Sequence, residues 1–389
     1  MMGKIVVGKE EAEHRLIRRA DMVACKLAFI DCKLPGSERK ENYSLIGPGV
    51  TQSKDQVVNL TETHGFSVGA AAMPAGTVNN LHMHFTAEVF MVYQGRWKFR
   101  WGCGTDVAEV DAGPGDILSI PTWVFRGFSN VGQSDGWIFT LLGGDDTGGI
   151  IWHPSVLEAA AAHGMYLTRG NMLVDTQAGD PMPSSEEILR PLDAGQVASL
   201  PRYTAADMDR RIVWCSQRDW SRSALLGSIA QQGCELAPAL GYGITESRDQ
   251  VPGVSNPHGF SVEWMRLSAG ASSGRFMLRE KLVIFVMSGS IDLVLNDADS
   301  ALRITVDAQD MYSVPAGAWR EIRCAGNTPA EIILAVAGDH RKRVVWPQEV
   351  LDEAQAAGYV LDPNGYIASL DMLPPTALGV GVAADTLIA

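Results

Sequence analysis

The chain has 389 residues, more than one ordinary hydrophobic core needs, and its length predicts about two domains. Its formal net charge of −13 at pH 7 argues against nucleic acid or an anionic membrane as a partner, because both need a basic face. We find no stretch of about 18 apolar residues that could span a bilayer. The N-terminal apolar run is too short for a secretory signal, and the six cysteines show neither a CxxC pair nor regular spacing. A cytoplasmic protein is therefore expected.

The segment from Gly76 to Gly95 carries the strongest chemical signal, because it reads Gly-x5-His82-x-His84-x3-Glu88-x6-Gly. Side chains alternate faces along a β-strand, so the spacing predicts that His82, His84 and Glu88 point the same way from one strand. Two imidazoles and one carboxylate can bind a metal and leave other positions open. Fe(II) is the expected metal, although Mn, Ni, Zn or Co would also fit these ligands. A buried polar cluster without a metal is the alternative.

Short alternating segments with glycine and proline between them predict that most of the chain is β-structure. Residues 96–101, Arg-Trp-Lys-Phe-Arg-Trp, place aromatic side chains on one face and cationic side chains on the other. If such faces turn inward they could line a pocket for a planar substrate, but plain core packing is the commoner role. The alanine-rich run 159–162, which is followed by Gly164, predicts a short helix with a glycine stop.

The chain also repeats itself. His64-Gly-Phe-Ser-Val recurs from His258, a shift of 194 residues. The same shift aligns Gly76 with Gly270, Gly95 with Gly289, Pro121 with Pro315, Arg126 with Arg320 and Trp152 with Trp346. A constant shift over so long a stretch predicts two copies of one domain. We expect an N-terminal domain over residues 1–180, a linker over 181–205 and a C-terminal domain over 206–389.

Residues 76–95 match the first motif of the cupin family at every specified position. Residues 115–130 resemble the second motif, with Arg126 where the family usually has a histidine and Trp123 where a glycine is usual. The chain therefore resembles a two-domain cupin, or bicupin. The resemblance implies an all-β fold of two tandem jelly-roll barrels (double-stranded β-helices) with short helices. Cupins include dioxygenases, decarboxylases, isomerases and storage proteins, so the family does not fix the function.

The second copy has lost the three candidate ligands. The shift aligns His82 with Phe276, His84 with Leu278 and Glu88 with Leu282. None of the replacements can bind a metal through its side chain. Since apolar residues serve in that copy, packing alone does not require the histidines, and we predict that they are metal ligands. His64 persists as His258 in the copy without a metal site, which predicts a structural role for it.

Arg126 is the predicted catalytic residue. An arginine stays protonated and cannot bind a metal, but its planar fork suits a substrate carboxylate or enolate at the open metal positions. The alternative is that Arg126 pairs with a nearby acid such as Glu88, or lies at the barrel rim. The persistence of Arg320 in the second copy favours this alternative.

Three functions fit these features. The first is an Fe(II)-dependent oxygenase, of the cupin dioxygenase type, that acts on a small aromatic or enol-containing molecule. The second is a redox-neutral metal-dependent isomerase, lyase or decarboxylase, which would need a general base that the sequence does not identify. The third is a non-catalytic metal-binding regulatory protein similar to pirin. A small-molecule substrate and a homo-oligomer, with a dimer favoured, are the expected partners.

Overall fold

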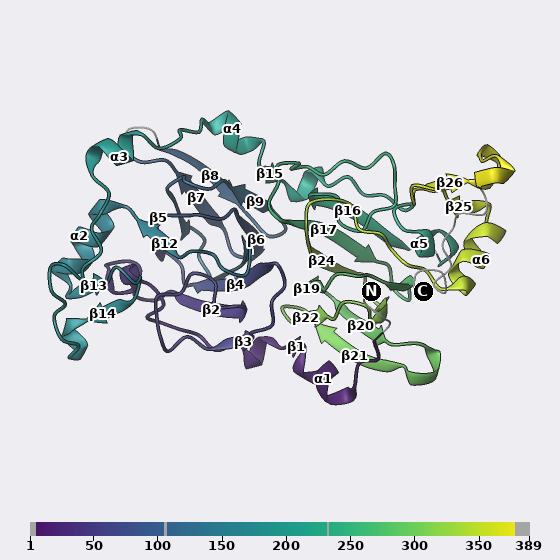
Figure 1. The fold of residues 1–389 in the computed structure, drawn as a ribbon, viewed down its shortest axis with the longest axis horizontal. Helices are drawn as coiled ribbons and strands as arrows, with labels where there is room; N and C mark the ends of the chain where they lie inside the picture. Colours follow the sequence, from purple (N-terminus) through teal and green to yellow (C-terminus); the bar gives the residue numbers. More distant parts are fainter. Residues whose placement is uncertain (1–4, 105–106, 232, 378–389) are drawn as a thin grey trace. The chain divides into compact units, whose positions relative to one another are not determined.

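The computed structural model describes residues 5–104, 107–231 and 233–377 of the chain (Figure 1). The chain divides into two compact units. We call Met22–Cys215 the N-terminal barrel, and Met1–Asp21 with Ser216–Ala389 the C-terminal barrel. Among the described residues, no helix has both the length and the hydropathy of a membrane-spanning segment.

The N-terminal barrel contains two large sheets. In order of pairing, the first sheet contains β15 (Ile212–Val213), β9 (Ile117–Ile120), β6 (Glu88–Gln94), β11 (Gly136–Gly143), β4 (Phe66–Met73), β2 (Glu41–Ile46) and β3 (Val58–Leu60). The second contains β12 (Ile150–Trp152), β5 (Val78–His84), β10 (Arg126–Asn130), β7 (Trp97–Trp101) and β8 (Ala108–Ala112). Shorter elements follow: α2 (Pro154–Ala162), β13 (Met165–Leu167), β14 (Leu173–Asp175), α3 (Ala194–Ala198) and α4 (Ala205–Asp209).

Inward side chains from both sheets form the core of this barrel. On β7, Trp97, Phe99 and Trp101 are buried and alternate with the half-buried Lys98 and Arg100, as the sequence pattern predicts. The three aromatic rings pack in one cluster with residues of β4, β6, β9, β10 and β11. The predicted helix is also present as α2, and Gly164 follows it with a φ of 72°, a left-handed conformation that favours glycine.

The C-terminal barrel repeats this plan. Its first sheet contains β1 (Leu16–Ile17), β22 (Met311–Val314), β19 (Leu282–Ser288), β24 (Ala330–Ala337), β17 (Phe260–Leu267) and β16 (Cys234–Leu240). Its second contains β18 (Ser272–Met277), β23 (Trp319–Cys324), β20 (Ser290–Leu295) and β21 (Leu302–Asp307). Its α-helices and its two further strands are α1 (Lys9–His14), α5 (Leu226–Gln231), α6 (Gln348–Ala356), β25 (Tyr359–Leu361) and β26 (Ile367–Ser369).

The strand registers show that the two barrels are copies. Glu88 lies opposite Ile120 and Leu142 in the N-terminal barrel. Leu282 lies opposite Val314 and Val336 in the C-terminal barrel. Each pair of equivalent positions differs by the shift of 194 residues found in the sequence. An all-β chain of two repeated barrels is therefore confirmed.

The two compact units differ from the predicted domains at both ends. Residues 1–21 belong to the C-terminal barrel, because Leu16 and Ile17 pair with β22 (Figure 1, purple beside green). Residues 206–215 belong to the N-terminal barrel, because β15 pairs with β9. In both cases a short strand covers an edge that would otherwise expose unpaired backbone groups. Such pairing between segments distant in sequence leaves no local pattern, so the sequence did not reveal it.

Candidate metal centre

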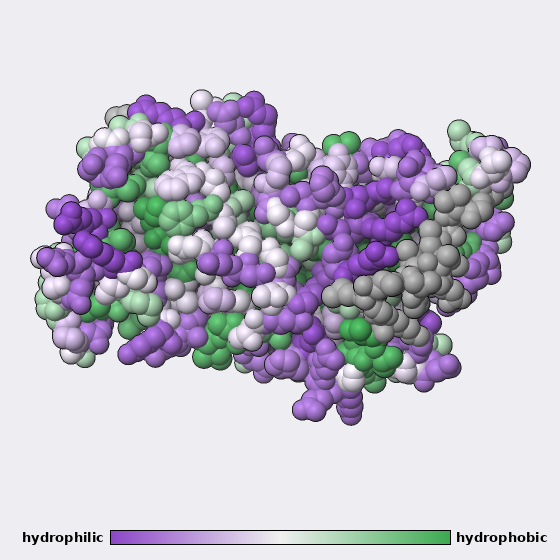
Figure 2. All heavy atoms as spheres, viewed as in Figure 1, coloured by the Kyte–Doolittle hydropathy of each residue, from purple (hydrophilic) through white to green (hydrophobic). Residues whose placement is uncertain are grey.

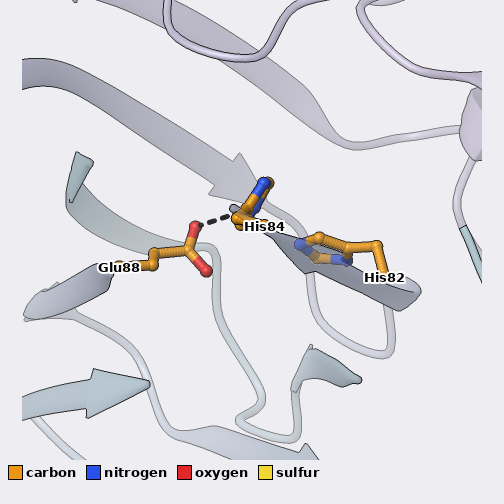
Figure 3. Close-up of side chains that lie close together, drawn as sticks. All are labelled: His82, His84 and Glu88. Atoms are coloured by element: carbon orange, nitrogen blue, oxygen red, sulfur yellow. Dashed lines mark ion pairs between the residues drawn. The ribbon is translucent and has the colours of Figure 1, made fainter. Parts of the chain in front are cut away.

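The three predicted ligands meet inside the N-terminal barrel (Figure 3). His82 and His84 lie on β5 of the second sheet, and Glu88 is the first residue of β6 in the first sheet. Their ligand atoms all lie within 4.8 Å of one another, and all three side chains are buried. The prediction that one strand carries all three was wrong. The chain turns at residues 85–87, so the carboxylate approaches the imidazoles from the opposite sheet.

Backbone carbonyls orient both imidazoles. Nδ1 of His82 lies 2.8 Å from the carbonyl oxygen of Asn80, and Nδ1 of His84 lies 3.4 Å from that of Gly149. These contacts assign the proton to Nδ1 and leave the Nε2 lone pair available for a metal. Burial lowers the pKa of His82 well below its ordinary value and also lowers the pKa of His84. Both rings are therefore in the neutral form that binds metals.

Glu88 is held as a carboxylate. Burial opposes its ionisation, whereas His84 and then Arg126 lower the pKa of Glu88. Because His84 is neutral near pH 7, the charge that holds Glu88 as a carboxylate there is the guanidinium of Arg126. Oε1 of Glu88 lies 3.5 Å from Nε2 of His84, and Oε2 lies 3.2 Å from Nε of Arg126. Two neutral imidazoles and one carboxylate, buried and convergent, are a donor set that fits a divalent transition metal.

Arg126 lies at the start of β10, opposite His82 of β5, and its side chain is 1% exposed. Burial lowers the pKa of Arg126 to about 10, against the opposing effect of Glu88, so the guanidinium stays charged. Arg126 is therefore paired with Glu88, which was one of the two alternatives drawn from the sequence. None of its three side-chain nitrogens has a hydrogen-bond partner in the part of the chain that the structure describes.

A cavity of about 70 Å³ lies beside the three ligands. Five aromatic side chains line it: Phe29, Tyr43, Phe90, Phe128 and Trp152. Its polar lining includes Asn42, Ser44, Thr51, Gln56, Ser67, Asn79 and Thr140. The aromatic stripe of β7 predicted from the sequence packs in the core and does not line this cavity. Phe29 and Tyr43 come from segments without a motif, so nothing in the sequence singled them out.

The cavity exists because small residues face inward on β4. Gly69 lines it, and a Cβ at this position would lie 2.9 Å from Oγ1 of Thr140. The shift of 194 residues aligns Gly69 with Glu263 and Ala71 with Met265. Both of these larger side chains are buried in the C-terminal barrel. Phe276, Leu278 and Leu282, which replace the three ligands there, are also buried in one apolar cluster.

Trp123 and His64 mark two turns of the N-terminal barrel. Trp123 has a φ of 59°, a left-handed conformation that is rare for a bulky residue and explains why cupins usually have glycine here. Its backbone N–H donates to the carbonyl oxygen of His84 over 3.2 Å, at the end of β5. Figure 2 shows hydrophobic residues gathered on the visible face of this barrel, and the exposed hydrophobic side chains include Phe85 and Trp123. His64 holds its turn through a contact of Nδ1 with the carbonyl oxygen of Glu62, the structural role predicted for it.

No family model matches the chain, and no curated protein sequence matches it. Solved structures do match. A formate complex of oxalate decarboxylase from Lactobacillus farciminis superposes with a TM-score of 0.56 at 10% identity, over 90% of this chain and 92% of that chain. A deletion mutant of Bacillus subtilis oxalate decarboxylase gives 0.54 at 13% identity, over 96% and 86%. Vicilin from hazelnut, Corylus avellana, gives 0.51 at 12% identity, over 85% and 88%.

At such low identity these matches establish the fold alone. They extend over both barrels, because each covers at least 85% of this chain. The strand registers and the convergent His-His-Glu cluster agree with that result. The protein therefore has the fold of a two-domain cupin, with the geometry of a cupin metal site in its N-terminal barrel and an apolar cluster at the equivalent position of its C-terminal barrel.

Proposed function

We propose that the N-terminal barrel binds one divalent metal through His82, His84 and Glu88. We further propose that the protein is a metal-dependent enzyme that acts on a small anion, a carboxylate or an enolate, without net oxidation or reduction. The observation that carries this proposal is the buried ion pair between Glu88 and Arg126, whose charged atoms are 3.2 Å apart.

The argument rests on the charge of the site. Arg126 already neutralises Glu88, and both histidines are neutral, so a bound divalent ion keeps its full double positive charge. Among the described residues that line the cavity, Glu88 carries the only acidic side chain, and no lysine or arginine lines it. A buried, uncompensated charge is costly, so a site of this kind favours an anionic ligand.

The lining suits a small oxygen-rich molecule. Among the described residues, the buried Nδ2 atom of Asn42 has no hydrogen-bond partner, and Ser67 and Thr140 line the same cavity. These groups would orient the substrate, while the rings of Phe90 and Phe128 exclude water from it. A bound metal would supply Lewis acidity, which polarises a carbonyl and stabilises an enolate. The names of the similar oxalate decarboxylases accord with such redox-neutral chemistry.

The oxygenase remains a second candidate because of the aromatic cavity wall. Phe29, Tyr43 and Trp152, together with the two phenylalanines already named, would suit a planar aromatic substrate. Three protein ligands also leave adjacent positions on a metal open, as oxygen chemistry requires. Fe(II) stays the predicted metal for that function, and Mn is equally compatible with the redox-neutral one. Assembly into a homo-oligomer also stays a prediction.

Metal titration followed by turnover assays tests the proposal. Metal-free protein is titrated with Mn²⁺ and Co²⁺, with His82→Ala as the control. The loaded protein is then incubated with small carboxylates and 2-oxo acids, in parallel with and without oxygen, and products are followed by NMR. One metal per chain, lost in His82→Ala, and turnover without oxygen would support the proposal. Turnover that requires oxygen would favour the oxygenase, and metal binding without any turnover would favour a non-catalytic role. Absence of metal binding would contradict all three.

A further inference from the structure

A buried ion pair lies behind the metal centre, between Lys40 and Asp31. Lys40 is 1% exposed and Asp31 is fully buried on the short helix η2 (Ile30–Lys33). Nζ of Lys40 also donates to Oδ1 of Asn79 over 2.7 Å. Oδ2 of Asp31 accepts from the backbone N–H of Asn80 over 3.0 Å and from its side-chain amide over 3.2 Å. The pair therefore fixes two consecutive residues of β5.

Both of these residues contact the ring of His82. Nδ2 of Asn79 lies 3.3 Å from Nδ1 of His82, and the carbonyl oxygen of Asn80 lies 2.8 Å from the same atom. Lysine has donors only, so the amide of Asn79 must turn its oxygen to Lys40 and its nitrogen toward the imidazole. The Nδ1 proton of His82 is donated to the carbonyl oxygen of Asn80, so the amide nitrogen of Asn79, itself a donor, packs against the ring without a hydrogen bond to it. Asp31, in turn, holds the backbone of Asn80, whose carbonyl group orients His82.

Lys40 does not itself reach the cavity. Besides its two oxygen partners, its ammonium group lies over the rings of Phe29 and Trp152, 5.4 Å and 5.9 Å from the ring centroids. Both rings line the cavity, whereas Lys40 does not. The ion pair therefore reaches the site through other residues, namely Asn79, Asn80 and the rings of Phe29 and Trp152, which makes its members positioning residues.

The C-terminal barrel provides an internal comparison. Glu41 lies opposite Ala72 in the N-terminal barrel, and Glu235 lies opposite Arg266 in the C-terminal barrel. Lys40 and Cys234, which directly precede the two glutamates, are therefore at equivalent positions. Gln52 and Glu246 are also equivalent. Gln52 accepts a hydrogen bond from the backbone N–H of Ile30, and Glu246 accepts one from that of Leu226. Ile30 and Leu226 therefore correspond, and so do the residues that follow them, Asp31 and Gly227. By the shift of 194 residues, Asn79 becomes Ser273, Asn80 becomes Gly274 and His82 becomes Phe276. The ion pair and both amides are thus present beside the histidine and replaced where the histidine is replaced.

This comparison separates function from folding. A buried ion pair is weak evidence for stability, because removing two charges from water offsets most of their attraction. The C-terminal barrel shows that the same scaffold is built without it. We infer that Asp31, Lys40 and Asn79 position His82 as a metal ligand, with Nε2 directed at the metal. This inference rests on the proposed metal-binding function.

Metal affinity of the full-length protein tests the inference. Co²⁺ is titrated into metal-free protein, and both the dissociation constant and the visible spectrum of the bound ion are recorded. The variants are Asn79→Ala, the double variant Asp31→Asn with Lys40→Met, and the combination of all three. Changing both members of the ion pair avoids leaving one buried charge alone. Ser273→Ala, at the equivalent position of the C-terminal barrel, is the matched control.

Partners behind a metal ligand typically contribute about 10- to 100-fold to metal affinity. We expect Asn79→Ala and the double variant each to weaken Co²⁺ binding by about this factor and to alter the spectrum of the bound ion. The triple variant should be no weaker than the double variant, because Asn79 is no longer held in place once the ion pair is removed. Ser273→Ala should leave the affinity unchanged.

Two results would overturn the inference, and they are distinguishable. If the unmodified protein binds Co²⁺ and the variants bind it equally well, the ion pair has only a structural role, even if the melting temperature falls. If the unmodified protein binds no Co²⁺ or Mn²⁺, the proposed metal function itself fails and the inference fails with it. Asn79→Ala removes no charge, so it gives a decisive result even if the double variant does not fold.

Discussion

Replacing Arg126 with methionine should have opposite effects on metal and anion binding. The side chain is buried and its Nε lies 3.2 Å from Oε2 of Glu88. At this separation and an effective dielectric constant of about 20, the attraction is about 5 kcal/mol. Removing one member of a buried ion pair typically costs about 3–5 kcal/mol, because the other charge is left unpaired. We therefore expect metal-free Arg126→Met to lose about that much unfolding free energy.

A bound metal should reverse much of this loss. For a unit of this size, each kcal/mol lowers the melting temperature by about 2–4 °C, so metal-free Arg126→Met should melt roughly 6–20 °C lower. A divalent ion compensates the carboxylate that Arg126 no longer pairs with, so Mn²⁺ should stabilise the variant more than the unmodified protein. Affinity of the metal-loaded variant for a small carboxylate should fall, because the site has lost one positive charge.

Calorimetry with and without Mn²⁺ measures the first effect, and isothermal titration with a carboxylate measures the second. Arg320→Met is the matched control, because Arg320 is equally buried but donates to the backbone carbonyls of Pro315 and Ala318. That variant should destabilise the C-terminal barrel and leave the response to Mn²⁺ unchanged. If metal-free Arg126→Met has the same melting temperature as the unmodified protein and the same dissociation constant for Mn²⁺, the charge argument is refuted.

Two further predictions concern the interiors of the barrels. Ala71→Met introduces the residue found at the equivalent position 265, and the larger side chain should fill the cavity. We expect titrations to show that carboxylate binding is abolished while Co²⁺ affinity is retained. Equal loss of carboxylate and Co²⁺ affinity would contradict this prediction. Burial, opposed by a hydrogen bond from the backbone N–H of Ile244, raises the pKa of Glu263 from 4.5 to about 8. Between these two pH values the folded state keeps a proton on Glu263 that the unfolded state releases. The contribution of Glu263 to the free energy of unfolding is therefore fully present below pH 4.5 and is lost as the pH rises through about 8. Glu263→Gln should therefore raise the melting temperature at pH 9 more than at pH 5, and an equal change at both values would contradict a protonated Glu263.

The candidate ligands were predictable from the sequence, but their arrangement was not. Strand parity correctly placed His82 and His84 on one face, because two residues of one strand obey its period. It could not place Glu88, since three residues of turn carry the chain to the opposite sheet. Lys40 and Asp31 escaped notice for a related reason. A lysine and an aspartate nine positions apart follow no pattern until the fold buries them together.

The internal repeat supported more predictions than any other feature of the sequence, because equivalent positions of the two barrels can be compared. It correctly separated His64, which has the same turn contact as His258, from the candidate ligands. The compact units depart from the predicted domains where β1 and β15 pair with strands that are distant in sequence. Pattern within a segment predicts its conformation, whereas the partner of a two-residue strand depends on which sheet edge remains open.

The same comparison limits what can be concluded from Arg126. A buried arginine occupies this position in both barrels, so the arginine alone is no evidence for catalysis. In the C-terminal barrel, carbonyl groups of Pro315 and Ala318 accept hydrogen bonds from Arg320, and its charge is attracted by Glu280, which replaces no metal ligand. In the N-terminal barrel the compensating group is Glu88, a candidate metal ligand. What distinguishes the first barrel is therefore the carboxylate placed between an arginine and two neutral imidazoles. That placement links the affinity of the site for a metal to its affinity for an anion, and it makes the Glu88–Arg126 pair the feature on which the proposed function depends.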